Sequence, residues 1–193
     1  MIVEGVVTSL SPSGKLNIAP MGPRVEGDFV RLMLRPFKTS TTFHNLTQTY
    51  CGVFHVVDTI DLLARAAIGE LLELPTTRPA SRINGRILVD CCRWFEFRIT
   101  ELDLSSERTF MSAEIVAQGE KRPFFGFNRA RHAVLEAAIL ATRVHLLPQT
   151  EIATQMTVLK SAVVKTGGVA EAEAFDMLQN YINRCMSGHN ERD

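Results

Sequence analysis

Residues 93–99 read Arg93-Trp94-Phe95-Glu96-Phe97-Arg98-Ile99. Two sets of side chains alternate along this stretch: Arg93, Phe95, Phe97 and Ile99 in one set, and Trp94, Glu96 and Arg98 in the other. A period of two is that of a β-strand, and the second set marks its wetter face. We therefore expect two long strands, 86–102 and 108–118, joined by a turn at Ser105-Ser106.

The residues before these strands predict shorter elements. Runs of β-branched and apolar residues bounded by turn residues predict short strands at 3–10, 15–21, 29–34 and 52–57. The first two form a hairpin, because the sequence between them, Ser11-Pro12-Ser13-Gly14, is typical of a turn. One helix is expected over 39–49, with Ser40 or Thr39 as its N-cap, and another over 58–68. Residues 74–85 are expected to form a loop.

The C-terminal third is predicted to be helical. Asn128 is a suitable N-cap for a helix that ends at residue 146, before Pro148. A second helix runs from residue 150 to Gly167-Gly168, and a third follows it. Antiparallel strands with short helices, followed by about 60 residues of helix, define the α+β class. We expect a small barrel rather than an open sheet, with domains at 1–127 and 128–193.

The composition is that of an ordinary globular protein. Of the 193 residues, 46% are hydrophobic and 22% charged, so the chain can bury a core without a disulfide or a metal. It holds 21 Lys and Arg against 21 Asp and Glu, and the resulting net charge of zero argues against a general polyanion-binding protein. We therefore expect no nucleic-acid partner.

The zero net charge conceals an uneven distribution. Three stretches without Asp or Glu, 29–57, 74–89 and 121–135, together hold ten of the 21 basic residues. Because the planar fork of Arg binds two oxygens of a phosphate at once, such stretches suit a local anion site. The ten residues are Arg31, Arg35, Lys38, Arg78, Arg82, Arg86, Lys121, Arg122, Arg129 and Arg131.

Neither the cysteines nor the N-terminus carries a recognisable signal. Cys51, Cys91, Cys92 and Cys185 form no C-x-x-C and have no His at zinc spacing, so we expect reduced thiols and no metal site. Cys91 and Cys92 lie in a strand-like run, where neighbouring side chains point to opposite faces, so we expect at most one of them to face the core. The N-terminus lacks the pattern of a signal peptide, and charges interrupt the longest apolar region, 133–147. We expect a cytoplasmic protein with no membrane partner.

The strongest candidate for a binding site is residues 35–46. They contain two cations, Arg35 and Lys38, and four consecutive hydroxyl residues, Thr39, Ser40, Thr41 and Thr42. A helix N-terminus presents free main-chain N–H groups and the positive end of the helix dipole, which suits a phosphate monoester. The alternative is a capped surface helix, because capping uses only one of the four hydroxyls.

Two further segments are candidates. Residues 17–23 read Asn17-Ile18-Ala19-Pro20-Met21-Gly22-Pro23, and they form either a plain exit from a strand or a flat backbone edge for a planar ligand. Residues 121–132 interleave basic and aromatic side chains, a pattern that suits stacking and phosphate binding. No nucleophile, Walker or dinucleotide motif is present, so no catalytic residue is assigned.

In order along the chain, these segments resemble the flavin-reductase-like FMN-binding split barrels. That group carries a helix with the motif Thr-x-x-Asn-Ile, which residues 42–46 of this chain resemble. A Thr-Gly pair follows, matched by Thr49 and Gly52, and then a Phe-Val-Val-Asn strand, matched by residues 53–58. The whole chain resembles still more a family of uncharacterised archaeal and bacterial proteins with that fold. Its Asn-x-Ala-Pro-x-Gly hairpin matches 17–22, and its helix, which opens Asn-Arg-Ala and ends Ala-Thr-Arg, matches 128–130 and 141–143.

The resemblance implies an antiparallel split β-barrel of residues 1–127 that binds FMN as a homodimer. The C-terminal helices, 128–193, would pack on the barrel or on the dimer partner. The resemblance assigns the FMN phosphate to the loop and helix start, with Arg35, Lys38, Thr39, Ser40, Thr41, Thr42 and Asn45. It assigns the ring system to Asn17, Ala19, Pro20, Met21 and Gly22. Arg122, Asn128 and Arg129 would complete the pocket or contact the second substrate. His55 is also expected in the cofactor site, at the position where the flavin-reductase strand usually carries Asn.

The function implied is that of a flavin-dependent oxidoreductase or a flavin reductase with a small-molecule substrate. FMN would perform the redox chemistry, while the protein binds and orients it. Two alternatives stay open. One is a non-enzymatic binding module for another phosphorylated planar ligand, such as a pterin of one-carbon metabolism or a haem-like molecule. The other is a structural dimer with a vestigial pocket.

Overall fold

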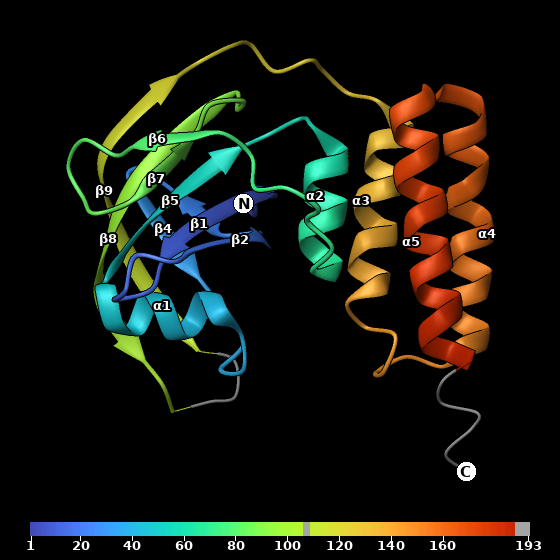
Figure 1. The fold of residues 1–193 in the computed structure, drawn as a ribbon, viewed down its shortest axis with the longest axis horizontal. Helices are drawn as coiled ribbons and strands as arrows, with labels where there is room; N and C mark the ends of the chain where they lie inside the picture. The colour runs from blue at the N-terminus through green and yellow to red at the C-terminus, as the bar shows by residue number, and fades with distance from the viewer. Residues whose placement is uncertain (106–108, 188–193) are drawn as a thin grey trace. The chain divides into compact units, whose positions relative to one another are not determined.

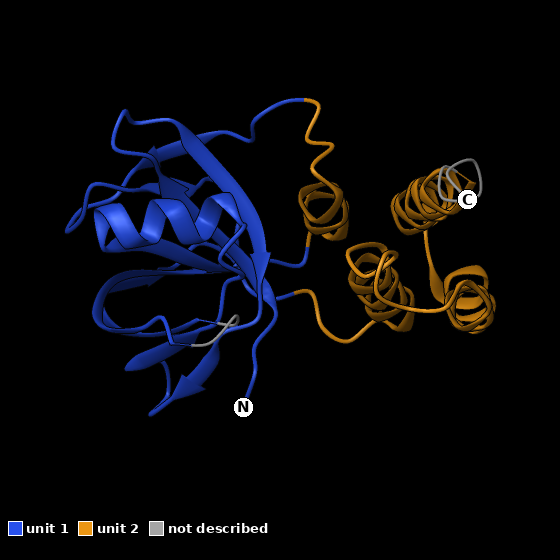
Figure 2. Cartoon of the chain, turned by 90° about the horizontal axis from the view of Figure 1, so that it is seen from below, with its two compact units in different colours: residues 1–58, 73–124 blue, residues 59–72, 125–193 orange. Residues whose placement is uncertain are grey.

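The computed structural model describes residues 1–105 and 109–187 (Figure 1). Two compact units can be distinguished in it, drawn in different colours in Figure 2. The first consists of Met1–Asp58 and Glu73–Phe124 and holds the strands together with one helix. The second consists of Thr59–Leu72 and Phe125–Asp193 and is helical.

A seven-stranded antiparallel sheet forms most of the first unit. Its order is β2-β1-β5-β8-β9-β4-β3, and it curls into a half barrel (Figure 1). The strands are β1 (Gly5–Leu10), β2 (Leu16–Met21), β3 (Arg24–Glu26), β4 (Arg31–Leu34), β5 (Cys51–Val56), β8 (Arg93–Asp103) and β9 (Phe110–Glu120). The hairpin of β1 and β2 confirms the first two expected strands, and β8 pairs with β9. The turn expected at Ser105-Ser106 lies partly outside the described residues. The expected α+β class is confirmed as well.

The alternation in residues 93–99 places Phe95 and Phe97 inside the half barrel, where both are fully buried. Helix α1 (Thr41–Thr49) covers this interior with Leu46. A Cβ added at Gly52 would lie 2.7 Å from the Phe97 ring and 3.2 Å from Leu46, so only glycine lets helix and sheet approach this closely. The buried cluster contains Val7, Leu32, Leu34, Leu46, Phe54, Phe95, Phe97, Ile99, Met111 and Ala113.

The long strand expected over 86–102 is interrupted. Its first part is β7 (Arg86–Leu88), which pairs with β6 (Thr77–Pro79) from the expected loop to form a second, two-stranded sheet. The chain then bends before β8 begins. Cys91 and Cys92 are 0% and 1% exposed, so the prediction that at most one would face the core is wrong. In a bend, neighbouring side chains need not point to opposite sides, as they do in a strand.

A left-handed turn shortens the third expected strand. Gly27, Asp28 and Phe29 have φ angles of 57°, 51° and 65°, so the chain reverses direction there and β4 begins only at Arg31. The turn joins β4 to β3, a short strand that the sequence pattern did not predict. The Phe29 ring stacks on the Phe95 ring with centroids 4.2 Å apart, which holds this bulky residue in a backbone region that it rarely adopts.

The second unit contains α2 (Ile60–Ile68), α3 (Arg129–Ala141), α4 (Gln149–Thr166) and α5 (Val169–Ser187). Helix α2 belongs with the C-terminal helices, although 60–68 lie within the stretch expected to form the barrel. Asn128 is the N-cap of α3, as expected, but α3 ends at Ala141 and not at residue 146. Among the described residues, no helix is both long and apolar enough to cross a bilayer.

Candidate functional site

Four polar side chains join the β1–β2 hairpin to helix α1. The Ser9 hydroxyl oxygen on β1 accepts hydrogen bonds from the side-chain amides of Asn17 (3.3 Å) and Asn45 (3.1 Å). The Asn17 amide also donates to the Thr42 hydroxyl at 3.0 Å. Ser9, Thr42 and Asn45 are buried. We call these four residues the Ser9 cluster. It brings together three of the residues expected from the sequence to bind a ligand: Asn17 of the hairpin, and Thr42 and Asn45 of the helix.

The segment that leads into α1 is held at several points. Ser40 is the N-cap, and its hydroxyl oxygen accepts from the Phe43 N–H at 3.1 Å. The Thr109 hydroxyl donates to the Pro36 carbonyl at 2.7 Å, and the Lys38 ammonium donates to the Leu104 carbonyl at 2.8 Å. The chain before the helix is therefore anchored to the β8–β9 connection, and the start of α1 has a defined position.

The first turn of α1 presents a set of hydrogen-bond donors. The first main-chain bond of the helix runs from the His44 N–H to the Ser40 carbonyl, so the N–H groups of Thr41 and Thr42 have no acceptor inside the helix. No acidic residue stands in this turn. Arg35, Lys38, Thr39 and Thr41 are exposed next to it. This combination of main-chain dipoles, hydroxyls and cations can bind an anion such as a phosphate.

Strand β2 forms an edge of the seven-stranded sheet. Pro20 lies opposite Val6 on β1. Because proline has no N–H to donate, we place Pro20 at a position of the ladder where the main-chain polar groups of β2 point away from β1. By the alternation of the ladder, Ile18 faces the same way. The edge therefore offers the N–H and carbonyl of Ile18 and the carbonyl of Pro20. Ala19 and Met21 alternate with these residues along β2 and are half-buried, and Met21 packs against the interior cluster.

Gly22 ends this edge at a point of close approach. A Cβ added there would lie 2.6 Å from a carboxylate oxygen of Glu4, so a larger residue would displace the Glu4 side chain.

His55 lies inside the wall of the half barrel and not at its surface. It is 0% exposed, its Nδ1 is 3.2 Å from the Val6 carbonyl, and its Nε2 accepts from the Leu88 N–H at 3.1 Å. This pattern requires the proton on Nδ1. Burial lowers the pKa of His55 to about 4, only partly opposed by the bond to Val6. Both ring nitrogens thus hold main-chain groups, and neither is left for a ligand.

Arg122 forms ion pairs with two carboxylates. Its guanidinium binds Asp58 in a bidentate fork, with one contact of 2.9 Å, and reaches Asp90 at 3.0 Å. Hydrogen bonds to Asp58, and then to Asp90, raise the pKa of Arg122 above its usual value. Arg122 therefore ties the end of β9 to the residues after β5 and before β8.

Asn128 and Arg129 belong to the helical unit. The Asn128 oxygen accepts from the Arg131 N–H and caps α3, while its amide donates to the carbonyl of Thr166, the last residue of α4, at 3.0 Å. Arg129 is exposed. These two residues and the Ser9 cluster lie in different compact units.

Sequence reasoning missed Ser9, the residue on which the cluster converges. The hairpin register pairs Ser9 with Asn17 across the turn at 11–14. Counting back from that turn would have placed the two side chains on one face of the hairpin, so a signal was present.

The curled antiparallel sheet with its C-terminal helices has the fold of the flavin-reductase-like split barrels, and solved structures with that fold superpose on this chain. The chain belongs to the DUF447 family of proteins of unknown function. The model of the family's N-terminal domain matches residues 3–122, and a second DUF447 model matches residues 128–180. The resemblance stated from the sequence is thereby confirmed. A search of curated proteins finds no match.

Among solved structures, the FMN-bound protein MM1853 of Methanosarcina mazei, also of DUF447, shares 24% identity. The match covers 93% of this chain and 94% of that one, with a TM-score of 0.82. Flavoredoxin of Methanosarcina acetivorans shares 12% identity over 64% of this chain and 74% of its own, with a TM-score of 0.54. The 2-nitrobenzoate 2-nitroreductase NbaA of Pseudomonas fluorescens shares 20% over 61% and 64%, with a TM-score of 0.52. At these identities the likeness establishes the fold.

The Ser9 cluster predicts that removal of the Ser9 hydroxyl destabilises the protein. In Ser9→Ala the buried Asn45 amide loses its acceptor, so the free energy of unfolding should fall by about 1–3 kcal/mol. Urea unfolding followed by the fluorescence of Trp94, the single tryptophan, measures this. Ser13→Ala, in the exposed turn of the same hairpin, is the control. Equal, small effects of both substitutions would mean that the cluster does not hold the helix.

The buried His55 predicts an acid-sensitive stability. Its pKa is about 4 in the folded chain and near 6.5 when unfolded, so below pH 6.5 the unfolded state binds a proton that the folded state refuses. This group should therefore remove about 2 kcal/mol of stability between pH 7 and pH 5. His55→Asn should lose that part of the pH dependence, and His44→Asn, at an exposed position, should keep it. Identical pH profiles for the wild type and His55→Asn would contradict the assignment.

Proposed function

We propose that this chain binds FMN, with the phosphate at the N-terminus of α1 and the ring system along the edge of β2. The observation that carries this proposal is the Ser9 cluster. Its hydrogen bonds hold the first turn of α1 beside Asn17 of β2, so one ligand can reach both the anion-binding donors and the strand edge.

The donors at α1 suit a phosphate monoester. A phosphate dianion can accept hydrogen bonds from the N–H groups of Thr41 and Thr42 and from the exposed hydroxyls of Thr39 and Thr41. Lys38 keeps two further N–H groups beyond its bond to Leu104. Arg35 adds a second cation, and the helix dipole acts in the same direction. The Thr42 hydroxyl already bonds Asn17, so its part is to position the turn.

The edge of β2 suits a flat ring with polar groups on its rim. The isoalloxazine system carries carbonyl oxygens and one ring N–H on its pyrimidine side. The Ile18 N–H can donate to such an oxygen, and the Ile18 and Pro20 carbonyls can accept from the ring N–H. Ala19, with a single methyl group, lets the ring approach the main chain.

The proposed activity is that of a flavin-dependent oxidoreductase or a flavin reductase. FMN supplies the redox chemistry when it is bound, and the residues of this chain bind and orient it. The structural similarity to an FMN-bound DUF447 protein, to flavoredoxin and to a nitroreductase supports this reading. A homodimer and the packing of 128–193 on the barrel or on the partner are proposed from the resemblance alone.

The phosphate site predicts a difference between FMN and riboflavin, which lacks the phosphate. Thr39→Ala with Thr41→Ala should weaken FMN binding by about a hundredfold or more, because two hydrogen bonds to a charged group are lost, and should leave riboflavin binding nearly unchanged. Titrations followed by flavin absorption and fluorescence measure both affinities.

The matched control is Thr47→Ala with Thr49→Ala, in the last turns of the same helix, where both hydroxyls bond helix carbonyls. It should affect neither ligand. If Thr39→Ala with Thr41→Ala weakened the binding of FMN and riboflavin equally, the phosphate would not lie at the N-terminus of α1. Bound FMN without turnover by NADH or NADPH would favour a binding module over an enzyme.

A further inference from the structure

Four arginines surround the β6–β7 hairpin on the outer face of the sheet. Arg78, Arg82 and Arg86 come from the hairpin, and Arg98 comes from β8, where it alternates with the buried Phe97 and Ile99. All four are exposed. Within residues 1–105 and 109–187, no carboxylate forms an ion pair with any of them. We call these four residues the arginine face.

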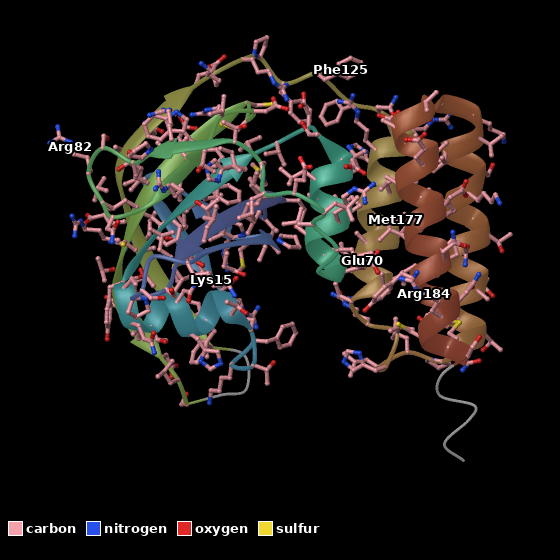
Figure 3. The ribbon with its side chains drawn as sticks, in the orientation of Figure 1. Lys15, Glu70, Arg82, Phe125, Met177 and Arg184 are labelled. Atoms are coloured by element: carbon pink, nitrogen blue, oxygen red, sulfur yellow. The ribbon has the colours of Figure 1, made fainter. Side chains whose placement is uncertain are left out.

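Two of these arginines are held in place by other groups. The Arg78 guanidinium lies 5.1 Å from the centroid of the Trp94 ring, and the Arg98 Nη2 donates to the Arg82 carbonyl at 2.7 Å. Figure 3 shows the Arg82 side chain at the outer edge of the ribbon, pointing away from it. A guanidinium that is already ordered loses less rotamer freedom when it binds, while its remaining N–H groups stay available.

A buried carboxylate fixes the loop that carries the arginine face. Glu96 is 0% exposed and accepts from the Ser81 N–H (2.8 Å), the Ser81 hydroxyl (2.9 Å) and the Arg82 N–H (2.6 Å). Its charge is therefore met by loop donors and not by the arginine side chains. A second acid, Glu114, stands opposite Arg98 in the strand ladder. The face keeps an excess of positive charge.

The spacing of the cations limits what they can bind. Arg78 stacks on Trp94, and Trp94 lies four residues before Arg98 on β8. Along a strand, this places the main chain of the two residues about 13 Å apart. With Arg78 stacked on Trp94 and Arg98 bonded to the Arg82 carbonyl, a single phosphate is a poor match for the two guanidinium groups together. The Trp94 ring lies over Gly119, where a Cβ would be 2.6 Å away, and under Arg78, so neither ring face is open for a nucleic-acid base. A row of carboxylates on a protein segment can pair with arginines at this separation, and it does not require an open face of the Trp94 ring.

We propose that the arginine face is a docking surface for an acidic protein segment. Arg forks bind carboxylates in bidentate pairs, and a row of like charges steers an oppositely charged partner during encounter. The surface lies on the side of β8 opposite Phe95 and Phe97, so it is separate from the interior that the Ser9 cluster borders. It does not depend on FMN binding.

The test is calorimetric titration of the full chain with an octaglutamate peptide, in about 0.01 M and about 0.15 M salt, where charges are screened beyond about 30 Å and about 8 Å. The peptide should bind at low salt, bind more weakly at high salt, and change the emission of Trp94. Arg78→Gln with Arg98→Gln should weaken binding by about tenfold or more. Arg82→Gln with Arg86→Gln should do the same; within the described part of the chain these two side chains form no hydrogen bond or ion pair.

The control pair, Arg24→Gln with Arg143→Gln, removes the same charge from exposed positions elsewhere and should bind like the wild type. Three results would overturn the proposal. The first is no binding at low salt, and the second is an equal loss in the control pair. The third is binding of octathymidylate or pyrophosphate as tight as that of octaglutamate, which would make the face a nucleic-acid or small-anion site.

Discussion

The hydrogen bonds to the Ser9 hydroxyl determine where helix α1 lies on the first hairpin. Two side-chain amides, from Asn17 and Asn45, converge on one buried oxygen, and Asn17 also reaches Thr42. A buried polar group without a partner costs about 1–3 kcal/mol, so other placements of the helix would leave several such groups unsatisfied. The first turn of α1 is therefore held beside the edge strand β2. The proposed ligand site is a consequence of this junction.

Similar hydrogen bonds recur through the first unit, where a buried side chain on or next to the sheet holds the main chain of a neighbouring segment. His55 holds Leu88, Glu96 holds Ser81 and Arg82, and Thr109 holds Pro36. Each bond lets an irregular segment pack closely on the sheet without losing the hydrogen bonds that water would supply. The result is two fixed surfaces, the start of α1 on the interior side and the arginine face on the outer side.

Local patterns predicted the parts of this structure that depend on neighbouring residues. The alternation in 93–99, the turn at 11–14 and the caps Ser40 and Asn128 are each readable within a few residues, and all are confirmed. The bend at Cys91 and Cys92 and the left-handed turn at Asp28 and Phe29 are not, because long-range packing stabilises them against local preference.

The candidate site shows the same division. The sequence pointed to Asn17, Thr42 and Asn45 separately, but their common partner Ser9 becomes visible only through the register of the hairpin. For Arg122, the sequence showed a cation in a basic stretch. It could not show that Asp58, 64 residues away, already binds the guanidinium. Charge in a sequence predicts an anion partner, and the fold decides whether that partner is a ligand or a carboxylate of the same chain.

The central claim is that the free N–H groups at the start of α1 receive the phosphate of FMN. Proton–nitrogen NMR of labelled protein tests it most directly, with FMN and then riboflavin added at saturating concentration. FMN should produce large downfield shifts of the Thr41 and Thr42 amide protons, and riboflavin should not. If flavin absorption shows FMN bound while these two amides keep their free-state shifts, the phosphate lies elsewhere and the account is contradicted.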